Sequence, residues 1–553
     1  MEAIYQEICK ELSLDADADL KLSRASSTQI VTFRGEEGTV WAPISADKRW
    51  GCITCIGASV LLLEQYYADF ERPVVTDRDA ASLILRMLER HAIPIAVTDI
   101  YGPQCWSVCF PVPDCPACRD SDRQLQDIMG AFRPLGHDNT TPEASDTGGV
   151  RAASATAFVA ANRAAIGFAA IVTNPYNGGD EPHATLIEGL IRTSITPNEC
   201  EVAGGKGRSL EQALASFIGE ALERYFVADP VAIPSVLGPE NDLVAAISPE
   251  IEFGYPALDD TTGITPYAPD LLLEWIAAEE LTGGNSVLLP ANLAFCPYEP
   301  RDARASRFSV TTTTGVASGA NVEDATLQAL LELIERDAFW YFARTGQGLA
   351  ELPEEALHPH VHAAKAVSHG RFTFQELLNP FGIPVVHATY VTDDAWETRT
   401  ARGIGAGENL EQASLRAFVE CLQILHSLNL GVEVEDVDGD MRHIWYTGAA
   451  RHLLPNFFQH SDQAAGPGEA YSGGKRRHSL RSILELFARS STEVYQVVLV
   501  DSPSFAVVRV MAAGMCLTDA TYFSNSKRFQ VFASALPGAP TSPRISYAGP
   551  TFM

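Results

Sequence analysis

Two spacings of apolar residues divide the chain into predicted helices and strands. Apolar residues recur every three or four positions after each of three Gly-rich segments, which is the spacing of an amphipathic helix. Shorter apolar runs predict strands between and before these helices. The mixture predicts an α+β (α/β-like) fold in which sheets back several helices. The helical patterns lie within 204–226, 313–339 and 403–423, and the strand patterns lie at 28–33, 38–44, 167–174, 184–194, 286–295, 307–314, 384–391 and 401–407.

Each of the three predicted helices carries a Glu three positions before a second acidic or amide residue. Positions i and i+3 share one face of a helix, where two carboxylates repel each other by about 0.2–0.5 kcal/mol on an exposed surface. One such pair is common, but three pairs that each follow a flexible Gly segment indicate oxygens that converge on cations. The pairs are Glu220 with Glu223, Glu332 with Glu335, and Glu420 with Gln423.

The chemistry of these pairs predicts a nucleotide site with Mg²⁺. Mg²⁺ is usually held by a few carboxylates together with substrate phosphates, and Gly-rich turns before helices offer backbone N–H groups to phosphate. In the third helix Leu415 and Phe418 lie around Glu420, so this carboxylate is expected to be buried and therefore paired or bound to metal. The alternative is that the carboxylates lie on solvated helix faces. The segment is not a Walker A loop, because Gly207 rather than Ser or Thr follows Lys206.

The three segments resemble the signature motifs of YcaO-domain proteins. GGKGRSLEQALASFIGEALER, GVASGANVEDATLQALLELIERDAF and GIGAGENLEQASLRAFVECLQ follow the order of the family's motifs, and VVRVMAAGM is similar to a late strand of the family. The resemblance covers about residues 158–553 and implies that the pairs hold Mg²⁺ and the ATP phosphates. By position it implies site residues at Glu220, Glu223, Glu332, Glu335, Glu420 and Gln423, with nucleotide contacts from Lys206, Ser216, Arg336 and Arg509.

Two C-x-x-C motifs in the first part of the chain predict a structural Zn²⁺ site, because four thiolates in two hairpins suit tetrahedral zinc. The motifs are Cys52 with Cys55, and Cys115 with Cys118. The alternatives are a redox motif or buried free cysteines, and Cys105 with Cys109 could replace one hairpin. This part is similar to the zinc-binding tail of the E1-like (ThiF-like) partners of YcaO proteins, without the nucleotide-binding half of an E1 enzyme.

The sequence thus predicts three parts. Residues 1–135 are a zinc-bearing remnant of an E1-like domain, and residues 136–158, rich in small and polar residues, are a linker. Residues 159–553 form the YcaO catalytic domain and end in a proline-bearing tail from 536, which is expected to be extended.

Composition and charge narrow the function classes. The chain is 46% hydrophobic with a net charge of −30, which argues against binding nucleic acid or an anionic membrane through a general basic field. The N-terminus has no basic start or long apolar run, so neither a signal peptide nor a membrane span is expected. Without a secretion signal, the 11 cysteines of the whole chain are expected to be reduced thiols or metal ligands, and a cytoplasmic location is expected.

The resemblance implies an ATP-dependent cyclodehydratase that converts Cys, Ser or Thr of a ribosomally made precursor peptide to thiazoline or oxazoline, through phosphorylation of the amide oxygen. The alternatives are peptide thioamide synthesis by a YcaO enzyme and a non-catalytic scaffold that docks a peptide. The expected partners are the precursor peptide, a separate E1-like or leader-peptide-binding protein, a dehydrogenase of the same pathway, and further subunits in a homodimer or hetero-oligomer.

Overall fold

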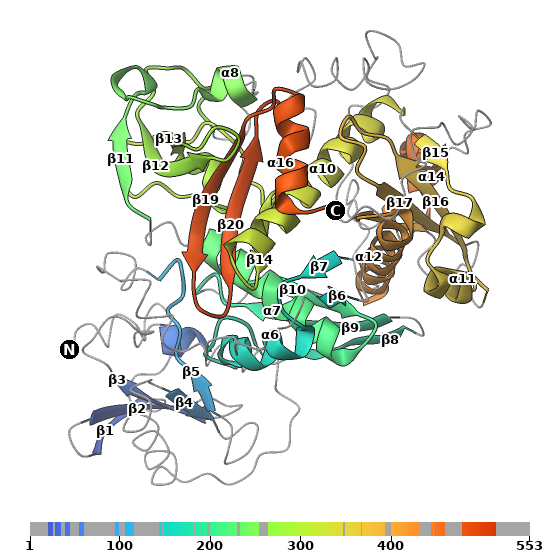
Figure 1. The fold of residues 1–553 in the computed structure, drawn as a ribbon. Helices are drawn as coiled ribbons and strands as arrows, with labels where there is room; N and C mark the ends of the chain where they lie inside the picture. The colour runs from blue at the N-terminus through green and yellow to red at the C-terminus, as the bar shows by residue number, and fades with distance from the viewer. Residues whose placement is uncertain are drawn as a thin grey trace.

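The computed structural model describes most of the chain from residue 149 onward and shorter stretches before it (Figure 1). The described residues are 20–25, 28–34, 39–44, 55–59, 95–98, 106–115, 143–145, 149–173, 175–181, 184–195, 200–228, 233–253, 264–346, 349–366, 368–392, 400–430, 444–445, 447–458 and 478–515. No helix within these ranges is both long enough and apolar enough to cross a membrane.

Antiparallel sheets form the framework of the molecule. An N-terminal sheet, in the order β1-β2-β3-β4-β5, contains Leu20–Ala25, Thr28–Arg34, Thr39–Ile44, Ile95–Thr98 and Trp106–Val108. A hairpin joins β6 (Glu143–Ser145) to β7 (Gly149–Arg151). A three-stranded sheet pairs β8 (Tyr176–Glu181), β9 (Ala184–Ile191) and β10 (Glu201–Gly207).

Two larger sheets complete the framework. The first runs β11-β12-β19-β20-β14 with β13 beside β12, and comprises Ser235–Gly238, Leu273–Glu280, Val494–Asp501, Ala506–Ala512, Val316–Gly319 and Asn285–Pro290. The second runs β15-β16-β17-β18 and comprises Leu349–Glu351, Arg371–Leu377, Val385–Val391 and Thr400–Ala406.

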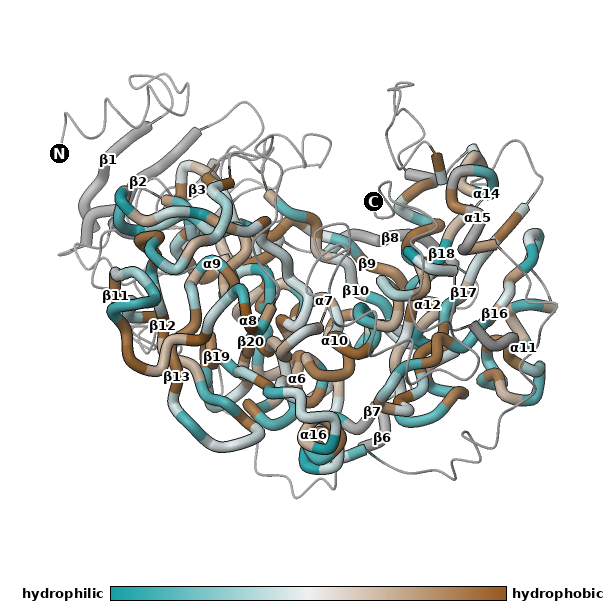
Figure 2. Tube along the Cα trace, turned by 90° about the horizontal axis from the view of Figure 1, so that it is seen from above, coloured by the Kyte–Doolittle hydropathy of each residue, from teal (hydrophilic) through white to brown (hydrophobic). Residues whose placement is uncertain are grey.

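The long helices lie between these sheets (Figure 2). Viewed from above, α7 (Leu210–Val227) and α10 (Val322–Thr345) run between the sheet of β19 and β20 and the sheet of β17 and β18, and α12 (Leu410–Leu430) packs on β18. The shorter helices are α6 (Ala155–Asn162), α8 (Pro249–Phe253), α9 (Ala291–Ala294), α11 (Pro359–Lys365), α14 (Ala450–Leu453), α15 (Pro455–Phe458) and α16 (Leu480–Arg489).

A strand followed by a long helix occurs three times, as β10–α7, β14–α10 and β18–α12. The connection has nearly the same sequence each time: GRSLEQA at 207–213, GANVEDA at 319–325 and GENLEQA at 407–413. Each of the three strands is the last strand of its own sheet, so one of its edges is open to side chains from a neighbouring unit. The fold is therefore built from three similar strand–helix units.

The repeated connection explains why each helix begins where it does. The side chains of Ser209, Asn321 and Asn409 accept hydrogen bonds from the backbone N–H three residues later. The residue at that later position bends back and accepts from the N–H just before the cap, at 2.9 Å for Gln212 and 3.2 Å for Gln412. This is a variant of the capping box, and it directs each helix back across its own strand.

Glycines in the strands allow the helices to lie very close to them. A Cβ on Gly403 would lie 2.2 Å from the Ala417 carbonyl oxygen and 2.3 Å from the Cys421 nitrogen, both in α12. A Cβ on Gly205 would lie 2.3 Å from the Ala213 carbonyl oxygen in α7. Because both contacts are with helix backbone, they cannot be relieved by a side-chain rotation.

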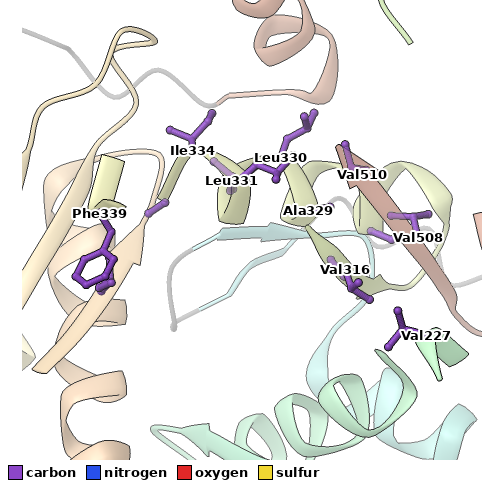
Figure 3. Packing of buried hydrophobic residues seen from close by; sticks show 14 of the residues in the cluster. Val227, Val316, Ala329, Leu330, Leu331, Ile334, Phe339, Val508 and Val510 are labelled. Carbon is purple, nitrogen blue, oxygen red and sulfur yellow. The ribbon is translucent and has the colours of Figure 1, made fainter. Parts of the chain in front are cut away.

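The hydrophobic core surrounds α10 (Figure 3). Ala329, Leu330 and Ile334 of this helix are fully buried, and Val316 and Val508 pack in the same cluster. At about 25 cal/mol per Å², complete burial of each aliphatic side chain contributes roughly 1.5–3 kcal/mol. Because α10 is packed on several sides, the carboxylates that it carries are placed on a rigid element.

Most of the predicted elements are confirmed. The strand patterns at 28–33, 184–194, 384–391 and 401–407 correspond to β2, β9, β17 and β18, and the helices after the three Gly-rich segments are present. The pattern at 286–295 forms β13 and then turns into the short helix α9.

Two predicted strands are wrong. Residues 307–314 are irregular, and residues 167–173 form a buried turn in place of a strand, with Gly167 at φ 156°. A Cβ on Gly167 would lie 2.4 Å from Ser107 Oγ, so the chain must bend where the neighbouring segment passes. The apolar residues of 167–173 misled the interpretation because a buried turn has the same composition as a buried strand, and the threonines of 307–314 misled it because Thr is common in strands.

The segment predicted to be a linker is ordered in its described part. Residues 149–158 contain β7 and the start of α6, where the Ser154 side chain accepts from the Ala157 N–H at 3.3 Å. Small and polar residues are common in linkers, but they also form caps and the walls of sites. The tail from 536 lies outside the described residues.

We predict that Gly403→Ala destabilises the protein by about 1–3 kcal/mol, because the new methyl group overlaps the α12 backbone. Gly238→Ala in β11 is the matched control, because a Cβ there would have its nearest neighbours at 3.6–3.8 Å. Calorimetry should show a lower unfolding temperature for Gly403→Ala alone. Equal unfolding temperatures for the two variants would contradict the close packing of β18 on α12.

Candidate nucleotide and metal site

A cavity of about 840 Å³ lies where α7, α10 and α12 come together. This volume is within the roughly 300–1,000 Å³ that is usual for small-molecule sites. The predicted residues that line it are Glu220, Glu223, Glu332, Glu335, Glu420, Lys206, Ser216 and Arg336. The three helices, which are far apart in sequence, thus bring the predicted carboxylates to one place.

The first carboxylate of each pair lies against a strand that begins or ends near the cavity. Glu220 Oε2 accepts from the Gly204 N–H at 3.2 Å, and Glu332 Oε2 accepts from the Gly315 N–H at 3.3 Å. Glu420 Oε2 lies 3.6 Å from Lys206 Nζ. Gly315 has φ 82°, a conformation that favours glycine, and it turns its N–H toward the carboxylate.

The second residue of each pair reaches the strand of the next unit. Glu223 of α7 accepts from the N–H of Ser318 in β14 at 2.7 Å and from its hydroxyl at 2.9 Å. Glu335 of α10 accepts from the N–H of Ala406 in β18 at 2.9 Å. Gln423 of α12 lies against β10, since a Cβ on Gly204 would be 2.1 Å from its Nε2. The three units are therefore arranged in a closed ring, in which hydrogen bonds to backbone N–H groups make two of the contacts and Gln423, lying over Gly204 of β10, makes the third.

Two arginines partly balance the negative charge. Arg336 Nε lies 3.9 Å from Glu332 and 3.8 Å from Glu335. Arg224 lies 3.9 Å from Glu220 and 3.6 Å from Glu201, which is at the start of β10. We call five of the carboxylates that line the cavity the carboxylate ring: Glu220, Glu223, Glu332, Glu335 and Glu420. The three cations Arg224, Arg336 and Lys206 are fewer than these five carboxylates.

Burial raises the pKa of most of these carboxyl groups. It raises the pKa of Glu223 to about 8, helped by the nearby charges of Glu332 and Glu220. It raises the pKa of Glu332 to about 7, where Arg336 opposes the shift. The pKa values of Glu220 and Glu335 are raised for the same reason.

Glu420 behaves differently from the other carboxyl groups of the ring. Burial opposes its ionisation, but the positive charges of Lys206, Arg336 and Arg402 together outweigh burial and lower its pKa. Arg402 is itself buried beneath Phe339, with its guanidinium carbon 4.7 Å from the ring centroid. The ring thus has one end, at Glu420, where protein cations already balance the charge, and another, around Glu223 and Glu332, where they do not.

These residues fit Mg²⁺ together with a polyphosphate. Mg²⁺ binds oxygen ligands, commonly one or two carboxylates plus substrate phosphates, and the ring offers carboxylate oxygens only. Burial, with the neighbouring carboxylates, raises the pKa values of Glu223 and Glu332, and a divalent cation bound beside them would favour their charged forms. Lys206 and Arg336 line the same cavity and could pair with phosphate.

Two predicted residues do not line the cavity. Arg509 in β20 is fully buried and donates to the carbonyl of Thr314, directly before Gly315. It therefore lies behind the cavity wall and supports the turn that contacts Glu332. Gln423 occupies the place against β10 described above.

The sequence interpretation missed several lining residues. Arg416 lies one helical turn before Glu420 and donates to the Ala406 carbonyl at 3.0 Å and to Gln328 Oε1 at 3.3 Å. Arg151 of β7 lies 3.9 Å from Asp324. Ser216, Gln328 and Arg416 each lie nine positions after the glycine that opens the repeated connection, at 207, 319 and 407. Aligning the three repeats would therefore have found Gln328 and Arg416. Arg151 gave no such signal.

The predicted zinc ligands are only partly covered by the described residues. Cys55 and Cys115 are fully buried in one small cluster with Val112, whose N–H donates to Cys55 Sγ at 3.2 Å. Cys52 and Cys118 lie outside the described residues. Within the described ranges no group of three or more His, Cys, Asp or Glu side chains could hold a metal ion by itself, so a Mg²⁺ ion at the carboxylates would need phosphate oxygens as further ligands.

Comparison with known protein families identifies the class of protein. The family model described as YcaO cyclodehydratase, ATP- and Mg²⁺-binding, matches residues 204–516. This range begins within β10 and contains the rest of the three strand–helix units and the β19–β20 pair. The chain therefore belongs to the YcaO family.

Similar proteins agree with this assignment. An uncharacterized protein of Methanothermobacter thermautotrophicus is 31% identical over 345 residues, which are 59% of this chain and 84% of that protein. A heterocyclase in complex with substrate and cofactor has a TM-score of 0.71 at 18% identity, over 95% of this chain and 77% of that one. YcaO from Methanopyrus kandleri bound with AMPPCP and Mg²⁺ has a TM-score of 0.52 at 21% identity, over 73% and 99%. At these identities the solved structures establish the fold.

We predict opposite effects of Glu223→Gln and Glu223→Ala on the metal-free protein. A Gln oxygen can still accept from Ser318, and Gln has no charged form whose burial would cost free energy, so Glu223→Gln should be at least as stable as the wild type. Ala leaves the buried Ser318 N–H without an acceptor, which costs about 1–3 kcal/mol. Unfolding temperatures measured without Mg²⁺ check this, and both variants should lose the stabilisation that Mg²⁺ and ADP give the wild type. Equal stability of the two variants would contradict the bond between units.

Proposed function

We propose that this YcaO protein is an ATP-dependent cyclodehydratase that forms thiazoline or oxazoline rings in a ribosomally made precursor peptide. The observation that carries the proposal is the convergence of Glu220, Glu223, Glu332, Glu335 and Glu420 around one cavity that also contains Lys206 and Arg336. Membership of an ATP- and Mg²⁺-binding cyclodehydratase family and the fold shared with heterocyclases support it.

The proposed reaction needs activation of an amide oxygen. A Cys, Ser or Thr side chain gives up its S–H or O–H proton and adds to the preceding carbonyl carbon, and the former carbonyl oxygen then takes the γ-phosphoryl group of ATP while ADP leaves. Departure of phosphate, with loss of the amide proton, forms the C=N bond of the ring. Bound Mg²⁺ would supply neutralisation of the phosphate charge.

The residues of the chain have separate roles in this proposal. Glu220, Glu223 and Glu332, where protein cations balance the charge only in part, act as metal ligands. Lys206 and Arg336 orient phosphate oxygens, since charge-assisted hydrogen bonds to phosphate are short and strong. Glu335 and Gln423 hold the neighbouring strands in place, so that the cavity keeps its shape.

We predict that Glu220→Gln, Glu332→Gln and Glu420→Gln each reduce peptide-dependent ADP release by at least about 100-fold, because each removes a charge from the site while preserving side-chain shape. ADP release is measured with precursor peptide and an E1-like or leader-binding partner present. Exposed Glu485→Gln in α16 is the control and should retain wild-type activity. Turnover within about tenfold of wild type in all three site variants would contradict the nucleotide site.

The peptide product distinguishes the proposed reaction from the other two functions. Mass spectrometry should show loss of one water for each ring, whereas thioamide synthesis exchanges oxygen for sulfur and a scaffold leaves the mass unchanged. The assay is run with the chain alone and with the partner, because the proposal includes a separate protein that delivers the leader peptide. Efficient ring formation by the chain alone would remove the partner from the proposal.

We also propose that Cys52, Cys55, Cys115 and Cys118 bind a structural Zn²⁺. The buried cluster of Cys55 and Cys115 and the amide hydrogen bond to Cys55 Sγ support this, because thiolate ligands are commonly stabilised by backbone N–H groups. The site would tie the N-terminal part of the chain to a segment that packs on the catalytic half.

We predict that the purified protein contains about one zinc per chain and that Cys115→Ser lowers both the zinc content and the unfolding temperature, since structural zinc contributes folding energy directly. Elemental analysis of freshly purified protein checks the content. Cys200→Ser, at a half-buried position far from the two motifs in sequence, is the control. A wild-type protein essentially free of zinc would contradict the site.

A further inference from the structure

Arg192 is a buried cation that joins three separate segments. It follows β9 directly, and its side chain is only 2% exposed. Its guanidinium donates to the carbonyl oxygen of Cys55 at 2.7 Å, and to those of Ala169 and Ala170 at 2.5 and 2.8 Å. A longer bond of 3.4 Å reaches the carbonyl of Phe110. One side chain thus connects the two cysteine-bearing stretches to the catalytic half.

All these partners of Arg192 are neutral carbonyl groups. Among the described residues no carboxylate lies within ion-pair distance of it. A buried charge balanced only by backbone dipoles is tolerated when every donor is satisfied, and breaking one part of such a network leaves the charge exposed to an apolar environment. Separation of these segments would therefore take the carbonyl partners away from Arg192, so the contacts of this side chain hold the interface closed.

Other polar contacts place the same interface beside the carboxylate ring. Tyr225, two residues after Glu223 on α7, donates its hydroxyl to the Pro111 carbonyl at 2.6 Å. Asp114 accepts from the Ser194 hydroxyl at 2.7 Å. The segment that carries Cys109 and Cys115 is thus bonded both to the helix of Glu223 and to the end of β9.

A short path leads from Arg192 to the cavity. In the antiparallel pairing of β9 with β10, Leu186 is opposite Lys206, and Glu188 is opposite Gly204. Gly204 donates to Glu220, and Lys206 pairs with Glu420. A shift of β9 therefore moves the two residues of β10 that contact the ring.

We propose that Arg192 is a positioning residue through which the cysteine-bearing stretches 55–59 and 107–115 are coupled to the nucleotide cavity. Nucleotide binding holds β10 and α7 in place and so keeps this interface closed, and opening of the interface weakens nucleotide binding by the same factor. The proposal rests on the nucleotide site proposed above, and it assigns to the N-terminal part a role in setting nucleotide affinity.

The reactivity of Cys109 measures the opening of the interface. Its thiol is 2% exposed and is not one of the proposed zinc ligands, so it can react with a maleimide only when the segment lifts away. The rate is measured by peptide mass spectrometry on the full chain, with and without Mg²⁺ and a non-hydrolysable ATP analogue. Calorimetric titration gives the Kd of the same analogue.

In the wild type, saturating nucleotide should slow Cys109 labelling by at least about fivefold. In Arg192→Met, Cys109 should be labelled faster than in the wild type when no nucleotide is present. Nucleotide should then slow the labelling by less than about twofold. The Kd of the nucleotide should rise by about the factor by which this protection has decreased. Arg192→Lys keeps the charge but not the forked geometry, and it should restore part of the protection. Ser194→Ala removes the hydroxyl that donates to Asp114 at the same interface and should keep the wild-type protection.

A purely structural role would lower the unfolding temperature of Arg192→Met but leave the ratio of labelling rates with and without nucleotide unchanged. That result would overturn the proposal. The proposal would also be overturned if nucleotide binds to the wild type but leaves the rate of Cys109 labelling unchanged. If Arg192→Met does not fold, Arg192→Lys carries the same test. Absence of any nucleotide binding by the wild type would instead overturn the proposed function, and this inference with it.

Discussion

Repulsion among buried carboxylates is the constraint on which the rest of this structure depends. Glu220, Glu223, Glu332, Glu335 and Glu420 share one cavity, and burial raises the pKa of all of them except Glu420. Such an arrangement opposes folding unless rigid elements hold it and cations compensate it. The well-packed α10 and the close contacts of α7 and α12 with their strands provide the rigidity. The missing positive charge is the physical reason to assign Mg²⁺ and a nucleotide to the cavity.

The glutamates of the cavity also provide hydrogen-bond partners for backbone N–H groups at the edges of neighbouring strands. An edge strand exposes N–H groups that need partners, and here Glu223 satisfies Ser318 while Glu335 satisfies Ala406. Glu223 uses the same oxygen for both of its bonds to Ser318, so its other oxygen is free of these bonds, whereas the other oxygen of Glu335 lies 3.8 Å from Arg336. Assembly of the three units and formation of the site are therefore one process, and the ring closes where Gln423 meets β10.

The sequence predicted the site better than it predicted the surroundings of the site. The carboxylates could be found because spacing along a helix fixes which residues share a face, and Lys206 lies near the end of β10, shortly before α7. Arg509 was expected at phosphate but lies behind the wall, because strand periodicity does not say which sheet face borders a cavity. Arg151 escaped notice because its short strand is surrounded by residues typical of linkers.

The buried turn at 167–173 shows why long-range contacts limit such predictions. Its apolar composition indicates a strand, but Arg192, close in space and distant along the chain, satisfies the carbonyls of Ala169 and Ala170 and so permits a turn inside the core. Pairings of this kind are visible only in the folded chain. The same contacts provide the connection between the N-terminal stretches and the cavity.

The most direct test of the account is to locate metal and nucleotide together. Crystals grown with Mn²⁺ and a non-hydrolysable ATP analogue would give anomalous peaks at the metal positions. The account predicts peaks between α7 and α10, within coordination distance of Glu220, Glu223 or Glu332, with the polyphosphate beside Lys206 and Arg336. Nucleotide bound elsewhere, with the carboxylate ring free of metal, would contradict it.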